Sequence, residues 1–323
     1  MKNRLLILSA FLLFCLTTRS FGKDLTAIRF EIVNNTIILK VKTVNNLNLN
    51  IVFDSASNEF LLDSALARGL HIINDSSESH GTNFINGTVP SIFFANKGIF
   101  KDSLLNSLYK RGNSINLNEW SKKCQVHIDG LIGVNGFFKQ IVLGLDFNKK
   151  LLTLNQAIDF TGNEHYDKLK MIYTDGGHEI TPNSAFHQLS ACKIKLALSE
   201  KCIIETNVQF DTGFNKSFIM LTNLNIDSMI HLLNKPFNVK NDHKSALGNG
   251  KSKLYDFEAD SILIDNHIKL INTRVHMGIA SRIALAGSGS LNTLCLAGIE
   301  FLRKYRKIYF DYRNMDIYLY ENV

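Results

Sequence analysis

Hydrophobic and polar residues alternate in short runs along most of the chain. Runs of this kind, rich in Val, Ile and Phe, are typical of β-strands. They predict strands over 28–32, 36–44, 47–53 and 141–154 in the first half and over 193–198, 203–210, 262–271 and 307–319 in the second. Helical patterns are few and short, over 64–70, over 227–233 and in the segments after Gly133 and Gly298. This balance predicts an all-β fold with a few short helices.

The strand pattern repeats once, with a long period. In each half a hydrophobic strand ends in an acidic residue, in the sequences FDSA at 53–56 and FDTG at 210–213. Each half later has two apolar residues and a glycine, at 131–133 and 296–298. From that glycine to the Asp of a closing hairpin is 13 residues in both halves, and to the end of the last strand is 21. Chance rarely supplies all these matches in one order, so we expect two related halves.

The first 22 residues have the pattern of an export signal. Lys2 and Arg4 precede an apolar run over 5–16, and Ser20 and Gly22 put small residues before a cleavage point. The run is shorter than the roughly 20 apolar residues of a membrane-spanning helix. We therefore expect a cleaved signal peptide and an exported protein, periplasmic or secreted, with an uncleaved N-terminal anchor as the alternative. No later stretch has the length and hydrophobicity of a membrane span, so none is expected after cleavage.

The charge of the chain points to no nucleic-acid partner. Cleavage of the signal removes three basic residues and no acid, which lowers the formal net charge from +7 to +4. An excess this small is typical of an ordinary solvated surface rather than of a nucleic-acid-binding face.

Four cysteines remain after the signal peptide. Their spacing has no CxxC pair and no neighbouring group of histidines, so we expect no metal site. Cys192 and Cys202 flank a predicted hairpin and pair across it in one interpretation, while free buried thiols are the other. The four residues, for which three pairings exist, are Cys124, Cys192, Cys202 and Cys295.

The repeated acidic sequences carry a resemblance to a known family. A hydrophobic strand that ends in Asp-Thr/Ser-Gly, followed by two apolar residues, a glycine and a short helix, resembles the lobe signature of the aspartic proteases. The second half resembles it through 210–213 and 296–305, and the first through 53–57 and 129–133. Two copies in one chain resemble the two-lobed, pepsin-like enzymes, of a bacterial exported type, rather than the homodimeric retroviral ones. The resemblance covers nearly all of the chain after the signal.

The resemblance implies a bilobal fold with pseudo-twofold related lobes, the N-terminal one over 23–160 and the C-terminal one over 161–323. It implies an aspartic endopeptidase in which Asp54 and Asp211 activate a water molecule. One carboxylate then acts as base and one carboxylic acid as acid, and the close pair holds a single proton. The implied partner is a peptide or protein substrate in a cleft between the lobes of a monomer, and no cofactor or metal is expected.

The resemblance also assigns supporting roles around the two acids. The hydroxyls of Ser55 and Thr212 are expected to hydrogen-bond across the junction of the halves and to fix the two loops. Gly213 leaves room for close approach of the backbone. Gly133 and Gly298 are expected to pack close behind the loops.

Two features depart from the family pattern. Ala56 stands where the family has glycine and adds a methyl group where backbones are expected to be close. The expected first-lobe flap lies over 79–89, with Gly81 and Gly87, and its aromatic residue is Phe84 where Tyr is usual. These departures keep two alternatives open. One is a catalytically inactive, protease-like protein that binds peptides, and the other is an exported β-rich adhesion or scaffold module.

Overall fold

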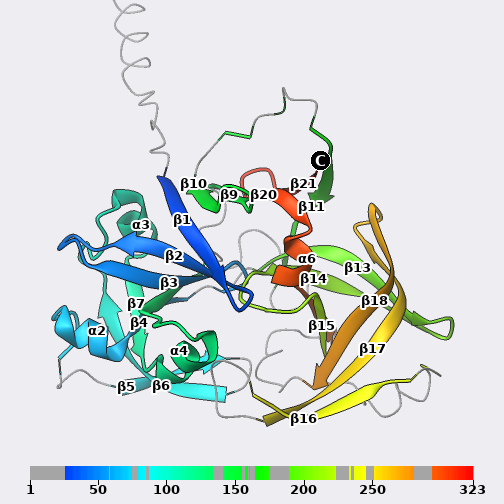
Figure 1. The fold of residues 1–323 in the computed structure, drawn as a ribbon, viewed down its shortest axis with the longest axis horizontal. Helices are drawn as coiled ribbons and strands as arrows, with labels where there is room; N and C mark the ends of the chain where they lie inside the picture. The colour runs from blue at the N-terminus through cyan, green and yellow to red at the C-terminus, as the bar shows by residue number, and fades with distance from the viewer. Residues whose placement is uncertain are drawn as a thin grey trace, which may run out of the picture.

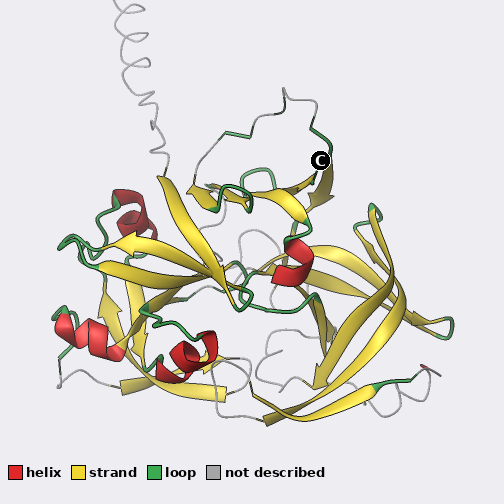
Figure 2. Ribbon diagram, viewed as in Figure 1, coloured by secondary structure: helices red, strands yellow, loops and turns green. Residues whose placement is uncertain are grey.

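β-Strands dominate the chain, joined by a few short helices (Figures 1 and 2). The prediction of an all-β fold is therefore confirmed. The computed structural model describes residues 26–57, 59–74, 79–84, 87–133, 141–154, 157–158, 160, 164–174, 189–222, 233, 236–244, 251–279 and 293–322.

The larger sheet has 13 strands and contains both the first and the last of the described strands. Strand β9 of the first half pairs with β20 of the second, so this sheet contains strands from both sides of residue 160. The predicted lobe boundary stays a prediction. In sheet order the strands are β11 (Tyr166–Lys170), β21 (Asp316–Glu321), β20 (Tyr305–Asp311), β9 (Val142–Asp146), β10 (Leu151–Leu154), β1 (Thr26–Val33), β2 (Thr36–Lys42), β3 (Asn48–Asp54), β8 (Gly130–Gly133), β4 (Phe60–Asp63), β7 (Arg111–Ile115), β6 (Gly87–Ala95) and β5 (Ser79–Phe84).

The second sheet has eight strands, all from the second half of the chain. In sheet order they are β12 (Ile172–Thr174), β13 (Leu189–Ser199), β14 (Cys202–Asp211), β19 (Thr293–Gly298), β15 (Phe218–Thr222), β18 (Ile268–Ile279), β17 (Lys251–Ile264) and β16 (Asn238–Lys244). An additional pairing of β13 with β17 closes six of these strands into a barrel.

The two halves repeat one pattern of strand pairing. In the first, β8 lies between β3, to which it is parallel, and β4, to which it is antiparallel. In the second, β19 lies in the same way between β14 and β15. The registers also agree, because Asp54 lies opposite Gly133 and Asp211 lies opposite Gly298. The internal repeat of the sequence is thus present in the strand topology.

Four short helices lie in the described part of the chain: α2 (Ser64–Gly69), α3 (Ser103–Leu108), α4 (Asn118–Cys124) and α6 (Ile299–Leu302). The helices predicted over 64–70 and after Gly298 are confirmed. Helices α3 and α4 were not predicted, because six or seven residues are too few to show a helical period. Of the helix predicted over 227–233 only residue 233 is described, and the segment after Gly133 lies outside the described residues. None of the described helices is both long and apolar enough for a membrane span.

One predicted strand is a hairpin instead. The run over 262–271 turns at Asp265 and Asn266, whose φ angles are 49° and 58°. Two residues in the left-handed region form the tight turn that matches the twist of a hairpin, and Asp and Asn tolerate that conformation. Strand β17 therefore ends at Ile264, and β18 begins at Ile268.

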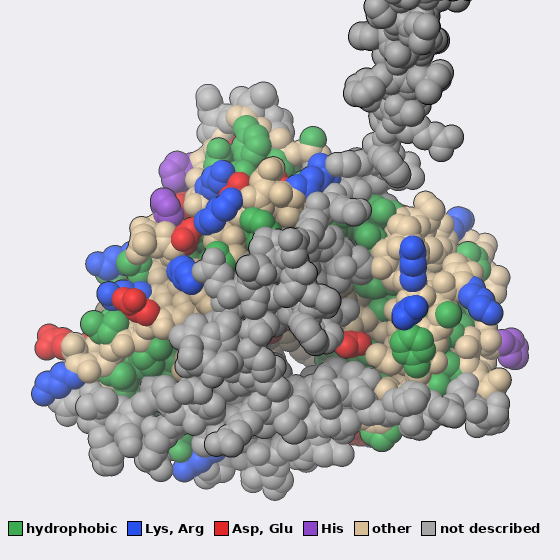
Figure 3. Space-filling view, turned by 180° about the vertical axis from the view of Figure 1, so that it is seen from behind, with side chains coloured by type: hydrophobic (Ala, Val, Ile, Leu, Met, Phe, Trp, Pro, Cys, Tyr) green, Lys and Arg blue, Asp and Glu red, His purple; other side chains and the backbone are tan. Residues whose placement is uncertain are grey.

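The strands that end in the motif glycines Gly133 and Gly298, β8 and β19, lie in the core. Strands β8 and β19 are buried along their whole length, which explains their uninterrupted apolar sequences. The described part of the face shown in Figure 3 is mixed, with Lys and Arg side chains scattered among acidic and neutral ones.

Candidate active site

Two acidic side chains from the two halves meet at the ends of equivalent strands. Asp54 is the last residue of β3, and Asp211 is the last residue of β14. Their carboxyl groups lie close enough for each to affect the pKa of the other through a side-chain hydrogen bond. A Cβ atom at Gly213 would lie 2.6 Å from Oδ2 of Asp54 and 3.1 Å from Oδ1 of Asp211, so both carboxyl groups border the same small space. The structure thus brings the two predicted acids face to face.

A reciprocal set of hydrogen bonds locks the two acidic loops together. The N–H of Ser55 donates to Oγ1 of Thr212 at 2.9 Å, and the N–H of Thr212 donates to Oγ of Ser55 at 3.0 Å. The Ser55 hydroxyl donates to the carbonyl oxygen of Phe210 at 2.6 Å. The Thr212 hydroxyl donates to the carbonyl oxygen of Phe53 at 3.0 Å. Both hydroxyl residues are buried, and a fully satisfied buried network of this kind rigidifies its surroundings. The hydrogen bonds expected from the resemblance are present.

Backbone amides of the loops hold one oxygen of each carboxyl group. Oδ1 of Asp54 accepts from the N–H of Ala56 at 2.9 Å. Oδ1 of Asp211 accepts from the N–H of Gly213 at 2.8 Å and from that of Phe214 at 3.1 Å. Ala56 therefore supplies the amide that a glycine would supply, although it adds a methyl group to the loop.

Burial raises the pKa of both carboxyl groups. For Asp211 burial lifts the pKa well above its ordinary value, and the negative charge of Asp54 lifts it further. The pKa of Asp54 is also raised by burial, while hydrogen bonds with Ala56, Asp211 and Ser57 offset part of this. Two adjacent carboxyl groups, one buried and one half-buried, cannot both ionise easily, so the pair is expected to hold one proton. The protons are gained and lost by the pair as a unit.

The two motif glycines lie directly behind the loops, as expected. A Cβ atom at Gly133 would lie 2.2 Å from the carbonyl oxygen of Ser57, and one at Gly298 would lie 2.2 Å from that of Lys216. Only glycine permits such an approach to backbone. The N–H of Gly298 also donates to the carbonyl oxygen of Ser217 at 2.8 Å, which ties the strand to the loop.

One buried tyrosine near the site was not predicted from the sequence. Tyr109 follows α3, and its hydroxyl donates to the carbonyl oxygen of Gly133. Its ring lies 5.2 Å from that of Phe60, which begins β4. Burial raises the pKa of Tyr109 well above its ordinary value, so the hydroxyl stays protonated as a donor. No motif in the sequence marks this residue, because its role comes from tertiary packing alone.

The predicted flap is a hairpin. Strands β5 and β6 pair so that Gly81 lies opposite Pro90 and Phe84 lies opposite Gly87. In Figure 1 this hairpin and β16 lie along the same edge of the molecule. The side chains over 79–88 lie outside the described residues, so a role for Phe84 stays a prediction.

The cysteines do not bond to one another. All four are free and buried. On the hairpin of β13 and β14, Cys192 lies opposite Val208 and Cys202 lies opposite Ser199, so the two are not cross-strand neighbours. Within the described residues no three His, Cys, Asp or Glu side chains are placed to hold a metal ion.

Comparison with protein-family models and with curated proteins finds no match to this chain. The candidate site therefore rests on its own geometry.

Proposed function

We propose that this chain is a two-lobed, pepsin-like aspartic endopeptidase. The observation that carries the proposal is the close pair of carboxyl groups, on the half-buried Asp54 and the buried Asp211, at the junction of two topologically repeated halves. The reciprocal hydrogen bonds of Ser55 and Thr212 support it, because they hold the two acidic loops in a nearly symmetric arrangement. The apolar N-terminal segment supports an exported, periplasmic or secreted place of action.

In the proposed reaction the dyad carries one proton and holds a water molecule. The ionised carboxylate takes a proton from the water, whose oxygen adds to the carbon of the scissile peptide carbonyl. The protonated carboxyl group gives its proton to the carbonyl oxygen. The tetrahedral intermediate then breaks its C–N bond. The carboxyl group that took the water proton passes it to the leaving nitrogen, and the other carboxylate takes a proton from a hydroxyl group of the intermediate, so the dyad again holds one proton. In the free enzyme this proton belongs to the pair as a whole, because the two groups are coupled and burial raises the pKa of both.

The singly protonated pair sets the pH dependence of the proposed activity. When the pH rises above the higher pKa of the pair, both groups ionise and the acid of the reaction is lost. Because burial raises that pKa, the activity extends from acidic pH toward neutral before it falls.

The direct test is cleavage of an unfolded protein or a peptide library by the mature chain over a range of pH. Asp54→Asn and Asp211→Asn are each expected to reduce the rate by about 100-fold or more, since each removes one partner of the acid–base pair. Glu205→Gln is the matched control, because Glu205 is an exposed acid paired with Lys195. Cleavage that persists in either Asn variant contradicts the assignment.

A second candidate function is peptide binding without hydrolysis. The observation in its favour is Ala56, whose methyl group stands where the second half has Gly213 beside the opposite carboxyl group. A statine-type inhibitor, which carries a hydroxyl in place of the attacking water, distinguishes the two. Tight binding that is lost in Asp54→Asn supports the enzyme. Peptide that is bound and recovered uncut at every pH supports the binding protein.

A further inference from the structure

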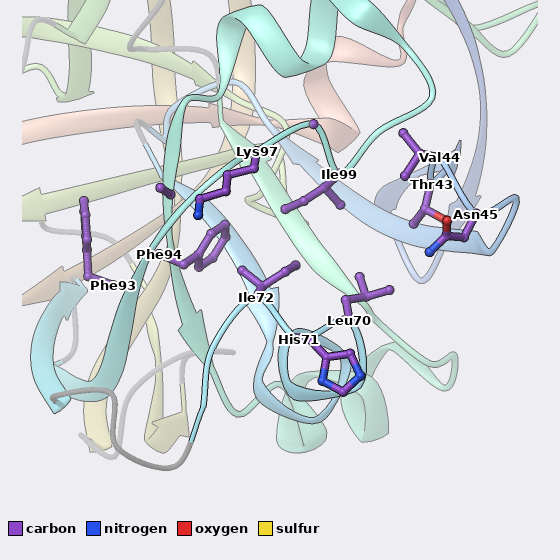
Figure 4. Close-up of a pocket in the computed structure, with 12 residues that line it drawn as sticks. Thr43, Val44, Asn45, Leu70, His71, Ile72, Phe93, Phe94, Lys97 and Ile99 are labelled. Carbon is purple, nitrogen blue, oxygen red and sulfur yellow. The ribbon is translucent and has the colours of Figure 1, made fainter.

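A pocket of about 440 Å³ opens in the first half, between the end of β2 and the end of β6 (Figure 4). Its side chains come from the β2–β3 turn, the segment after α2, the end of β6 and the loop that follows β6. Half of the twelve lining residues have large apolar side chains: Val44, Leu70, Ile72, Phe93, Phe94 and Ile99. The volume of this cavity, which combines apolar side chains with a few polar groups, is in the range of small-molecule sites.

The pocket lies where the first half departs from the second. In the second half β13 and β17 pair over four positions, from Ile194 opposite Ile264 to Ala197 opposite Ser261. The equivalent strands of the first half, β2 and β6, are joined only through a bridge beyond their ends, between Thr43 and Phe100.

A local turn explains this open seam. The chain turns away after β6, because Oδ1 of Asn96 accepts from the N–H groups of Gly98 and Ile99 at 3.0 and 2.9 Å. Gly98 has a φ of 93°, which favours glycine, so the turn is built into the sequence. The pocket therefore follows from the local sequence around Asn96 rather than from loose packing.

The rim of the pocket exposes large hydrophobic side chains. Val44 is 57% exposed and Phe93 is 51% exposed. Leu47, in the same turn as Val44, is 45% exposed. These are three of the eight large hydrophobic side chains exposed in the described part of the chain. An exposed apolar group beside an apolar cavity marks a binding site more often than a solvated surface.

The ionisable side chains that line the pocket are basic. Lys97 and His71 line it, and among the described residues none of the lining side chains is acidic. The Lys97 side chain extends toward Phe94, while His71 lies near Leu70 (Figure 4). Lys97 forms no ion pair with any described residue. An anionic group beside Lys97 would accept a charge-assisted hydrogen bond from its ammonium group.

We propose that this pocket binds a small molecule with an apolar body and one carboxylate, such as a medium-chain fatty acid. The apolar body lies against Phe94, Ile72 and Val44, and the carboxylate accepts from the ammonium group of Lys97. The pocket is separate from the proposed dyad. It lies by the turn before β3, whereas Asp54 ends that seven-residue strand, about 20 Å away at 3.3 Å per residue. The proposal therefore holds whether or not the chain is a protease.

The test is titration calorimetry of the mature chain with decanoate. Saturable binding of one decanoate per chain is expected. Decylamine, which has the same apolar length and the opposite charge, is expected to bind at least about tenfold more weakly. Equal binding of the two, or uptake that does not saturate, overturns the proposal.

Titration of single-residue variants tests whether the decanoate binds in this pocket. Lys97→Gln is expected to weaken decanoate about tenfold and to remove the preference over decylamine. Phe93→Ser removes apolar contact at the rim and is expected to weaken both probes. Ile271→Ser is the matched control, because Ile271 is 63% exposed in the second half, and it is expected to change neither. All three positions are exposed, and thermal melts of the variants check their folding.

Unchanged decanoate binding in Lys97→Gln contradicts the assignment of the carboxylate. A chain that is dimeric in solution and becomes monomeric in Phe93→Ser overturns the proposal as well. The pocket would then be an interface between two copies.

Discussion

The two halves of the chain share one strand order and differ in how fully each is closed. Around the acids they agree closely: the register of each acid opposite its glycine and the reciprocal hydroxyl bonds occur in both. Away from the acids they diverge. The second half closes a six-stranded barrel, whereas in the first half a single bridge joins the equivalent seam. The comparison teaches that the geometry is repeated where two carboxyl groups must meet and is relaxed elsewhere.

The motif glycines give the strongest test of that agreement. Gly133→Ala and Gly298→Ala each place a methyl group 2.2 Å from a backbone oxygen, which cannot move without shifting an acidic loop. We expect each to lower the free energy of unfolding by about 3 kcal/mol or more. Urea unfolding measures both. Gly69→Ala, where a Cβ atom would meet nothing within 4 Å, is the matched control. A large loss in one half and none in the other would break the equivalence of the two loops.

The loop positions after the acids sharpen the difference between the halves. Gly213→Ala puts a methyl group 2.6 Å from Oδ2 of Asp54, so we expect the carboxyl groups to separate and any peptide cleavage to fall by about 100-fold. Ala56→Gly removes a methyl group and keeps the amide donor to Asp54, so cleavage is expected to change less than about threefold. The rates of both variants on one peptide give the comparison. Equal losses would show that the two positions are equivalent after all.

The more buried acid is expected to limit stability at neutral pH. Burial raises the pKa of Asp211 above its ordinary value of 3.8, so the folded chain favours the protonated form. The stability that this group contributes is present in full below pH 3.8 and is lost as the pH rises through the raised pKa. Asp211→Asn cannot ionise, so it is expected to be more stable than the parent at pH 7, with the gap closing at acidic pH. Urea unfolding at several pH values measures this gap, and a variant that is less stable at pH 7 contradicts it.

Tyr109 gives the smallest expected effect and acts on the first half alone. Tyr109→Phe removes the bond to the carbonyl oxygen of Gly133 and leaves that oxygen buried, which costs about 1 kcal/mol of unfolding free energy. The ring and its contact with Phe60 remain. Chemical denaturation measures the loss. A change below the error of the measurement would mean that the bond adds no net stability.

The sequence predicts the parts of this molecule that are strongly periodic or repeated. The β-strands, the two acids and the motif glycines follow from alternation and from a twofold repeat, because these residues are constrained by backbone geometry that any copy must satisfy. Three features could not be predicted. The hairpin at Asp265 lies inside a run whose apolar residues continue on both sides of a short polar segment, Tyr109 reaches Gly133 only through tertiary packing, and the open seam by Asn96 depends on which strands fail to pair.

The central claim is that the halves bring Asp54 and Asp211 together so that they share one proton. The direct measurement is a carbon-13 NMR titration of the aspartate carboxyl groups in the mature chain, with Asp54→Asn and Asp211→Asn used to assign the two signals. We predict that the pair titrates in two steps, the upper one well above 3.8, and that replacing either partner moves the remaining signal. Two carboxyl groups that titrate independently near 3.8, each unaffected by loss of the other, would contradict the account.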